Sequence, residues 1–139
     1  MTHDPNKAQQ DIISDFSLFD SWLDRYQYLI DLGKALKPLD ESEKTDDILL
    51  HGCQSRVWLI IEGDSSELTI RANSDAAIVS GLIALLIRVY SGASAEQILQ
   101  SQPEFITAIG LQQHLSPTRA NGLHAMLQAI YKAANNYLK

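Results

Sequence analysis

Apolar residues recur at helical spacing in the first third of the chain. From Asp11 onward they return every three or four positions, which predicts an amphipathic helix that ends just before Pro38. Asp20 or Ser21 is a candidate N-cap, because a short side-chain oxygen can accept a free backbone N–H of the first turn. We interpret the Trp–Tyr–Leu stripe of this helix as core. Residues 1–10 are polar and are predicted to be a flexible lead.

Three short apolar runs follow, separated by polar and turn-forming residues. They span residues 48–50, 57–61 and 68–72. Residues 63–66 have the composition of a tight turn, and a linker this short permits only antiparallel pairing of the second and third runs. The pattern therefore predicts a small three-stranded antiparallel sheet.

The second half of the chain has the pattern of several helices. Residues 73–75 are expected to cap a helix whose apolar positions between 78 and 89 cover nearly every side, so this helix should be buried. Gly81 within it costs about 1 kcal/mol relative to alanine, which indicates that another backbone packs closely against it. Start signals predict further helices at residues 94–97, 103 and 116–117.

Composition fits one globular domain over residues 1–139. The chain is 45% hydrophobic and 20% charged, enough for one core and too short for two. Helices, then three strands, then helices predict an α+β fold, with the small sheet packed against several helices. No repeat or linker interrupts the chain.

Charge and hydropathy exclude several classes of function. The net charge of −6 has the wrong sign for a nucleic-acid-binding protein. The longest apolar run, residues 76–87, is too short to cross a bilayer, and residues 1–10 lack the apolar core of a secretory signal. One cysteine cannot form an internal disulfide, and a free thiol persists best in a reducing compartment. We therefore expect a cytoplasmic protein.

The single cysteine, Cys53, follows Gly52 and precedes the apolar run at 57–61. A glycine here indicates a tight loop that can present the thiol to a partner. Only the thiolate is a good sulfur nucleophile, so a reactive Cys53 needs a neighbour that favours its charged form, and His51 and Arg56 are the nearest candidates. An inert, packed thiol is the alternative, because free cysteine is among the most buried residue types.

Arg119 is a third candidate to act on the thiol. It lies in the first turn of the last predicted helix, where a cation opposes the helix dipole, so another group must hold it there. That group is either a carboxylate such as Asp75, in a structural ion pair, or the site around Cys53.

The sequence lacks the residue patterns that other kinds of site require. His51, Cys53, His114 and His124 do not have the clustered spacing of a zinc site. A cysteine hydrolase needs a base oriented by a third group, and no local signature of one occurs. One cysteine cannot hold an iron–sulfur cluster, and no glycine-rich phosphate loop is present. We expect no bound metal or cofactor.

Four sequence blocks occur in a characteristic order. They are Trp-Leu-Asp-Arg-Tyr-Gln-Tyr-Leu-Ile-Asp-Leu-Gly at 22–33, Gly-Cys-Gln-Ser-Arg-Val-Trp at 52–58, Ser-Asp-Ala-Ala-Ile-Val-Ser-Gly-Leu at 74–82 and His-Leu-Ser-Pro-Thr-Arg-Ala-Asn-Gly-Leu at 114–123. Together they resemble the SufE family, the sulfur-acceptor partners of cysteine desulfurases. The resemblance runs from about residue 16 to the C-terminus.

The resemblance implies a SufE/IscU-like fold and a persulfide carrier rather than a self-sufficient enzyme. A SufS-like or CsdA-like desulfurase, which brings the pyridoxal phosphate, would hand sulfur to Cys53 and be stimulated by the acceptor. The carrier would then pass sulfur to an iron–sulfur scaffold. The supporting residues it implies are Gly52, His51, Gln54, Arg56, Asp75 and Arg119.

Two positions depart from the family pattern. Ile48 stands where many members have asparagine, which removes a loop-fixing hydrogen bond. Arg56 stands where the main branch often has glutamine and is similar to the CsdE branch, whereas Gln54-Ser55 favours the SufE branch.

A stand-alone thiol redox enzyme or sensor that uses Cys53 is the alternative function, and a non-catalytic adaptor is a third. The oligomeric state, including a homodimer, and the final sulfur recipient stay open.

Overall fold

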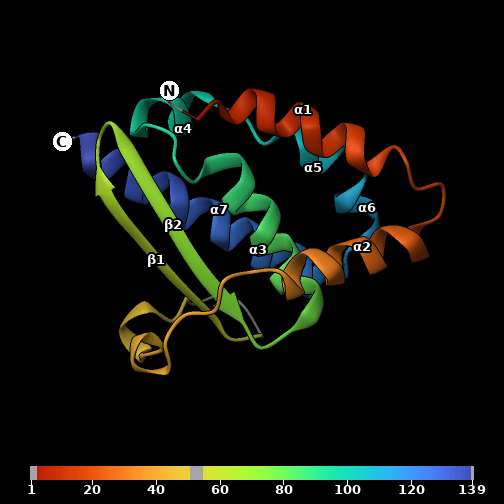
Figure 1. Cartoon of the computed structure of the whole chain (residues 1–139), viewed down its shortest axis with the longest axis horizontal. Coiled ribbons are helices and arrows are strands. Elements are labelled where there is room, and N and C mark those ends of the chain that lie inside the picture. Colours follow the sequence, from red (N-terminus) through yellow and green to blue (C-terminus); the bar gives the residue numbers. More distant parts are fainter. Residues whose placement is uncertain (1–2, 51–54, 139) are drawn as a thin grey trace.

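The computed structural model describes residues 3–50 and 55–138, in which one β-hairpin packs against a group of helices (Figure 1). The fold is α+β, as predicted, but the chain is mostly helical and its sheet is smaller than the predicted one. In chain order the elements are α1 (Pro5–Phe16), α2 (Trp22–Lys34), the 3₁₀ turns η1 (Glu41–Glu43) and η2 (Asp46–Ile48), β1 (Val57–Asp64), β2 (Glu67–Ser74), α3 (Ala77–Tyr90), α4 (Ala95–Gln100), α5 (Glu104–Ala108), α6 (Leu111–His114) and α7 (Pro117–Leu138). No helix in this described part is long and apolar enough to span a membrane.

Helix α3 is the centre of the core, as its nearly all-round apolar pattern predicts. It runs between the hairpin and the N-terminal helices, with α7 beside it (Figure 1). Its buried residues share one cluster with the inward-facing residues of β2 and α7. They include Leu82, Ile83, Leu85, Leu86, Val89 and Tyr90 from α3, Leu68, Ile70 and Ala72 from β2, and Leu123, Met126, Leu127 and Ile130 from α7.

Two glycines let α2 and α3 approach closely, which confirms the prediction at Gly81. A Cβ on Gly81 would overlap the carbonyl oxygen of Leu29 in α2. A Cβ on Gly33 of α2 would lie 2.8 Å from the backbone nitrogen of Gly81. Real Cβ atoms do not approach backbone atoms so closely, so any side chain here would force the helices apart.

The sheet has two strands in the described residues, and the prediction of a third is wrong. β1 and β2 pair antiparallel from Val57↔Ser74 to Asp64↔Glu67. Residues 48–50 do not form a strand, because Ile48 closes the 3₁₀ turn η2 and leaves too short a segment for a ladder. Only an isolated bridge between Leu49 and Trp58 remains of the predicted pairing.

Residues 5–10, expected to be a flexible lead, instead form the first turns of α1. The Asp4 side chain accepts the backbone N–H of Asn6 (3.0 Å) and caps the helix. Gln9 is only 3% exposed. Its side chain donates to Ser101 Oγ (3.0 Å) and Gln102 O (2.8 Å), and it accepts the Phe105 N–H (3.0 Å). These bonds fix α1 to the α4–α5 connection and satisfy a polar group that burial would otherwise penalise.

The remaining boundaries mostly follow the predicted signals. Ser21 is the N-cap of α2, accepting the Asp24 N–H at 3.2 Å. The helix that was predicted to start near Asp11 is divided between α1 and α2 by residues 17–21. Ser94 and Gln97 form the predicted capping box of α4, and α7 begins at Pro117.

Candidate functional site

Four of the predicted site residues, His51, Gly52, Cys53 and Gln54, lie outside the described residues. The site is therefore built from the chain on either side of them. Leu50 precedes this stretch and Ser55 follows it.

The two described segments on either side of residues 51–54 are joined by backbone pairing. The N–H of Leu50 donates to the carbonyl of Val57 at 2.8 Å. Next to this bond, Leu49 and Trp58 form the isolated bridge. This pairing fixes Leu49 and Leu50 against the start of β1.

Asp75 fixes the chain after Cys53 through the backbone of Arg56. Its Oδ1 accepts the Arg56 N–H at 3.1 Å, and its own N–H donates to the Arg56 carbonyl at 3.3 Å. The contact extends the β1–β2 ladder by one position beyond Val57↔Ser74. Asp75 thus holds the backbone of a neighbouring site residue, a role that neither an ion pair nor a helix cap anticipates.

The predicted cap of α3 at residues 73–75 is shifted. The N-cap is Ala76, which has no capping side chain, and Ser74 Oγ accepts the Ala76 N–H at 3.2 Å. Asp75, the residue before the N-cap, instead uses its Oδ1 to accept the Arg56 N–H.

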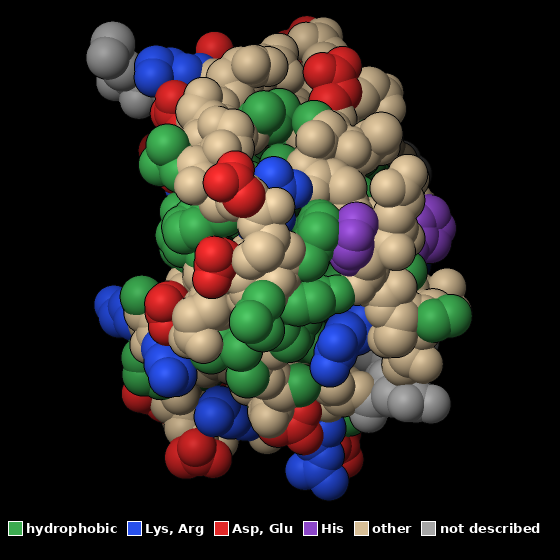
Figure 2. Space-filling view, turned by 90° about the vertical axis from the view of Figure 1, so that its right-hand side faces the viewer, with side chains coloured by type: hydrophobic (Ala, Val, Ile, Leu, Met, Phe, Trp, Pro, Cys, Tyr) green, Lys and Arg blue, Asp and Glu red, His purple; other side chains and the backbone are tan. Residues whose placement is uncertain are grey.

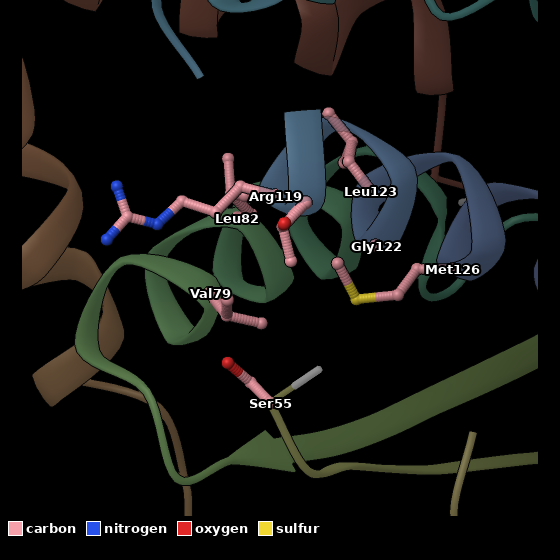
Figure 3. A pocket seen from close by; sticks show the side chains of 8 residues that line it. Ser55, Val79, Leu82, Arg119, Gly122, Leu123 and Met126 are labelled. Atoms are coloured by element: carbon pink, nitrogen blue, oxygen red, sulfur yellow. The ribbon is translucent and has the colours of Figure 1, made fainter. Parts of the chain in front are cut away.

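Ser55, two residues after Cys53, faces a pocket between α3 and α7 (Figure 3). The space in it that a water-sized sphere can reach is only about 20 Å³, room for one or two water molecules. Its walls are largely apolar, and one cation, Arg119, belongs to them. The lining residues are Ser55, Val79, Leu82, Thr118, Arg119, Gly122, Leu123 and Met126.

Arg119 lies at the rim of this pocket and is exposed. In Figure 3 its guanidinium points away from Met126 and passes over the first turn of α3. Within the described residues 3–50 and 55–138, Asp75 and Arg119 form no ion pair. The structural ion pair that the sequence left open is therefore not formed, and the role of Arg119 near Cys53 stays a prediction.

The arrangement suits an anion at the pocket mouth. A nearby guanidinium favours the ionised form of a thiol, whereas apolar walls disfavour it. The net effect on a thiol depends on how close it lies to Arg119. Arg56, the other described candidate cation, has an exposed side chain and takes part through its backbone.

Sequence reasoning missed the apolar wall that α7 contributes to the pocket. Leu123 and Met126 fit the helical core pattern, and nothing in that pattern separates pocket lining from filled core. In the described part of the chain no three potential ligands among His, Cys, Asp and Glu come together as a metal site. His114 instead stacks on Trp22, with ring centroids 4.0 Å apart.

Comparison with known proteins agrees with the resemblance in the four blocks. Residues 10–134 match the family model "SufE: Fe-S metabolism associated domain". An uncharacterized SufE-like protein of Rhizobium meliloti (strain 1021) is 41% identical over 132 residues, covering 91% of this chain and 94% of the relative. A second, from Rhizobium etli, is 41% identical over 128 residues, covering 88% and 86% of the two chains.

A solved structure confirms the fold. The solution structure of a hypothetical protein from Thermus thermophilus superposes with a TM-score of 0.76 at 21% identity, covering 94% of this chain and 96% of that one. At this identity the likeness speaks for the fold alone. The family match and the relatives speak for descent, and on their strength the chain belongs to the SufE family of Fe–S metabolism associated domains.

Proposed function

We propose that the protein accepts sulfur on Cys53 from a pyridoxal-phosphate-dependent cysteine desulfurase and passes it on for iron–sulfur cluster assembly. Membership of the SufE family supports this assignment. The observation that carries it is the chain on either side of Cys53, the only cysteine in the sequence: Leu50 is paired with Val57, and Ser55 faces a pocket that has Arg119 at its rim.

The proposed step is a thiol–persulfide exchange. The Cys53 thiolate attacks the terminal sulfur of a persulfide on the desulfurase cysteine. The sulfur–sulfur bond of the donor breaks, its cysteine leaves as a thiolate, and a new sulfur–sulfur bond forms on Cys53. One sulfur atom moves, and no external oxidant or reductant is needed.

The exposed apolar surface supports a protein partner. Leu18 and Leu23, at the corner between α1 and α2, are each 79% exposed. Figure 2 views the molecule from the side of this corner and shows hydrophobic side chains gathered in the middle of that face, with both acidic and basic side chains around them. Exposed apolar patches of this kind are typical of protein–protein contact. We propose a SufS-like or CsdA-like desulfurase as the partner.

The pyridoxal phosphate belongs to the desulfurase in this proposal, so the protein alone should neither bind it nor release alanine from L-cysteine. Added to a desulfurase, it should increase alanine release. The measurement is alanine formed with desulfurase alone, with this protein alone and with both together. Absorbance of a Schiff base in this protein alone, or an unchanged alanine rate in the mixture, would contradict the proposal.

Arg119→Gln should slow sulfur acceptance more than Arg56→Gln does. Both changes remove one positive charge, but only the Arg119 side chain lines the pocket that Ser55 faces. A guanidinium near a thiol favours the thiolate, and we propose that Arg119 acts on Cys53 in this way, so losing Arg119 should raise the pKa of Cys53 and slow its reaction at neutral pH by about tenfold. The measurement is the pH dependence of Cys53 alkylation. Identical profiles for wild type and Arg119→Gln would show that Arg119 does not activate the thiol.

A further inference from the structure

The segment that leads to the site, residues 37–50, lies mostly on the surface. Leu39 is its one buried apolar residue, at 5% exposure. A segment with so little buried apolar surface has to be placed by other contacts. Besides the backbone pairing of Leu49 and Leu50 with β1, three side-chain contacts join this segment to the β-hairpin.

The first contact uses Asn73 of β2, which is 9% exposed. Its Oδ1 accepts the N–H of Leu39 at 2.5 Å, and its Nδ2 donates to the carbonyl of Lys37 at 3.3 Å. A side-chain amide thereby fixes the start of the segment to the end of the strand.

The second contact is the strongest and uses Arg71, also on β2. Its two terminal nitrogens donate to both carboxylate oxygens of Glu43, at 3.1 and 2.8 Å. Its Nε donates to Glu62 of β1 at 3.0 Å. Fork-shaped pairing of this kind fixes direction as well as distance. The hydrogen bonds from Arg71 hold the pKa of the Glu43 carboxyl below its ordinary value, so the pair stays charged at neutral pH.

The third contact is made by the residue that follows Glu43 in the chain. Lys44, next to Glu43, places its ammonium 5.4 Å from the ring centroid of Trp58 in β1. The same Trp58 pairs with Leu49, one residue before Leu50. Arg71, Glu43, Lys44 and Trp58 thus form a continuous chain of contacts from β2 to the backbone pairing at the base of the site.

We propose that Arg71 is a positioning residue for sulfur transfer. Through Glu43 it places Lys44 on Trp58 and keeps Leu49 and Leu50 in register with β1. Leu49 and Leu50 are the last described residues before Cys53 in the chain. The inference rests on the proposed function, because it assigns Arg71 a part in the reaction at that cysteine. Arg71 itself touches no reacting atom.

The test is Arg71→Gln, measured by single-turnover sulfur transfer from a persulfidated desulfurase over a range of acceptor concentrations. We expect the rate at saturation to fall about tenfold, because small misplacements far from the chemistry slow a reaction strongly. The half-saturating concentration should stay within about twofold, because Arg71 is placed to act within the acceptor. Glu43→Gln should give the same loss, and the double variant should be no worse than either single variant.

The matched control is Asp15→Asn, which breaks the Arg88–Asp15 ion pair (2.9 Å) between α3 and α1. The side chains of Arg88 and Asp15 are 37% and 38% exposed, close to the 34% of Arg71 and the 28% of Glu43. It should lower the thermal midpoint as much as Arg71→Gln does and leave the transfer rate unchanged. Equal transfer rates for wild type and Arg71→Gln would overturn the role of Arg71 alone. A wild type that accepts no sulfur would overturn the proposed function, and this inference with it.

Discussion

Cys53→Ser is expected to abolish sulfur acceptance and leave the fold intact. Serine differs from cysteine by one atom, but its hydroxyl is a far weaker sulfur nucleophile than a thiolate. The exchange nearly conserves side-chain volume, so the thermal midpoint should stay within about 2 °C. The measurement is sulfur bound per molecule of acceptor after incubation with a desulfurase and L-cysteine. No sulfur should remain on the variant.

Wild type that has been alkylated at Cys53 is the control, because it loses the thiol without a mutation. It should behave as Cys53→Ser does in both sulfur binding and stimulation of the desulfurase. If Cys53→Ser stimulated its partner at full strength, the carrier mechanism would be wrong.

Gly81→Ala should destabilise the fold strongly, although it adds only one methyl group. The new Cβ would meet the carbonyl of Leu29, which is backbone and cannot turn aside as a flexible side chain can. Overpacking of this kind costs about 3 kcal/mol, and the better helix propensity of alanine offsets about 1 kcal/mol of it. We expect the thermal midpoint to fall by roughly 5–10 °C.

Gly33→Ala tests the same contact from the side of α2, where the added Cβ would lie 2.8 Å from the Gly81 nitrogen. Ala77→Gly, at an exposed position in the first turn of α3, measures the propensity term without a clash and should cost at most about 1 kcal/mol. A Gly81→Ala variant as stable as wild type would mean that α2 and α3 can separate at little cost.

The centre of this fold could be predicted from its sequence because local and global signals agree there. An apolar pattern on every side of residues 78–89 indicates a buried helix, and a glycine within it indicates a close neighbour. Ser21, the capping box at Ser94 and the proline at 117 likewise act within one turn of helix. Signals of such short range can be identified in one sequence.

The errors arose at two places, one held by distant contacts and one decided by a neighbouring turn. Gln9 fixes the helix of residues 5–10 to the rest of the fold, because its amide bonds to Ser101, Gln102 and Phe105, more than ninety positions away. The apolar run at 48–50 failed to form a strand because the preceding turn already uses Ile48. Neither fact is contained in the local pattern of hydrophobic and polar residues.

The site shows the same division. Cys53 could be proposed from sequence as the only thiol, and Arg119 from its place in the first turn of the last predicted helix, with Asp75 as a candidate partner. The way each residue works could not be identified. Asp75 bonds to the backbone of Arg56, and the contact from Arg71 to Glu43 joins residues 28 positions apart. Both depend on how the hairpin places its outward-facing side chains.

The most direct test of the account is the mass of Cys53 after reaction. The protein is incubated with a cysteine desulfurase and L-cysteine, digested without reducing agent, and the peptide that contains Cys53 is weighed by mass spectrometry. The expected result is the added mass of one sulfur atom on Cys53, dependent on both desulfurase and L-cysteine and removed by a thiol reductant. An unchanged peptide under these conditions, with Cys53 oxidised by peroxide alone, would contradict a sulfur carrier and favour a redox sensor.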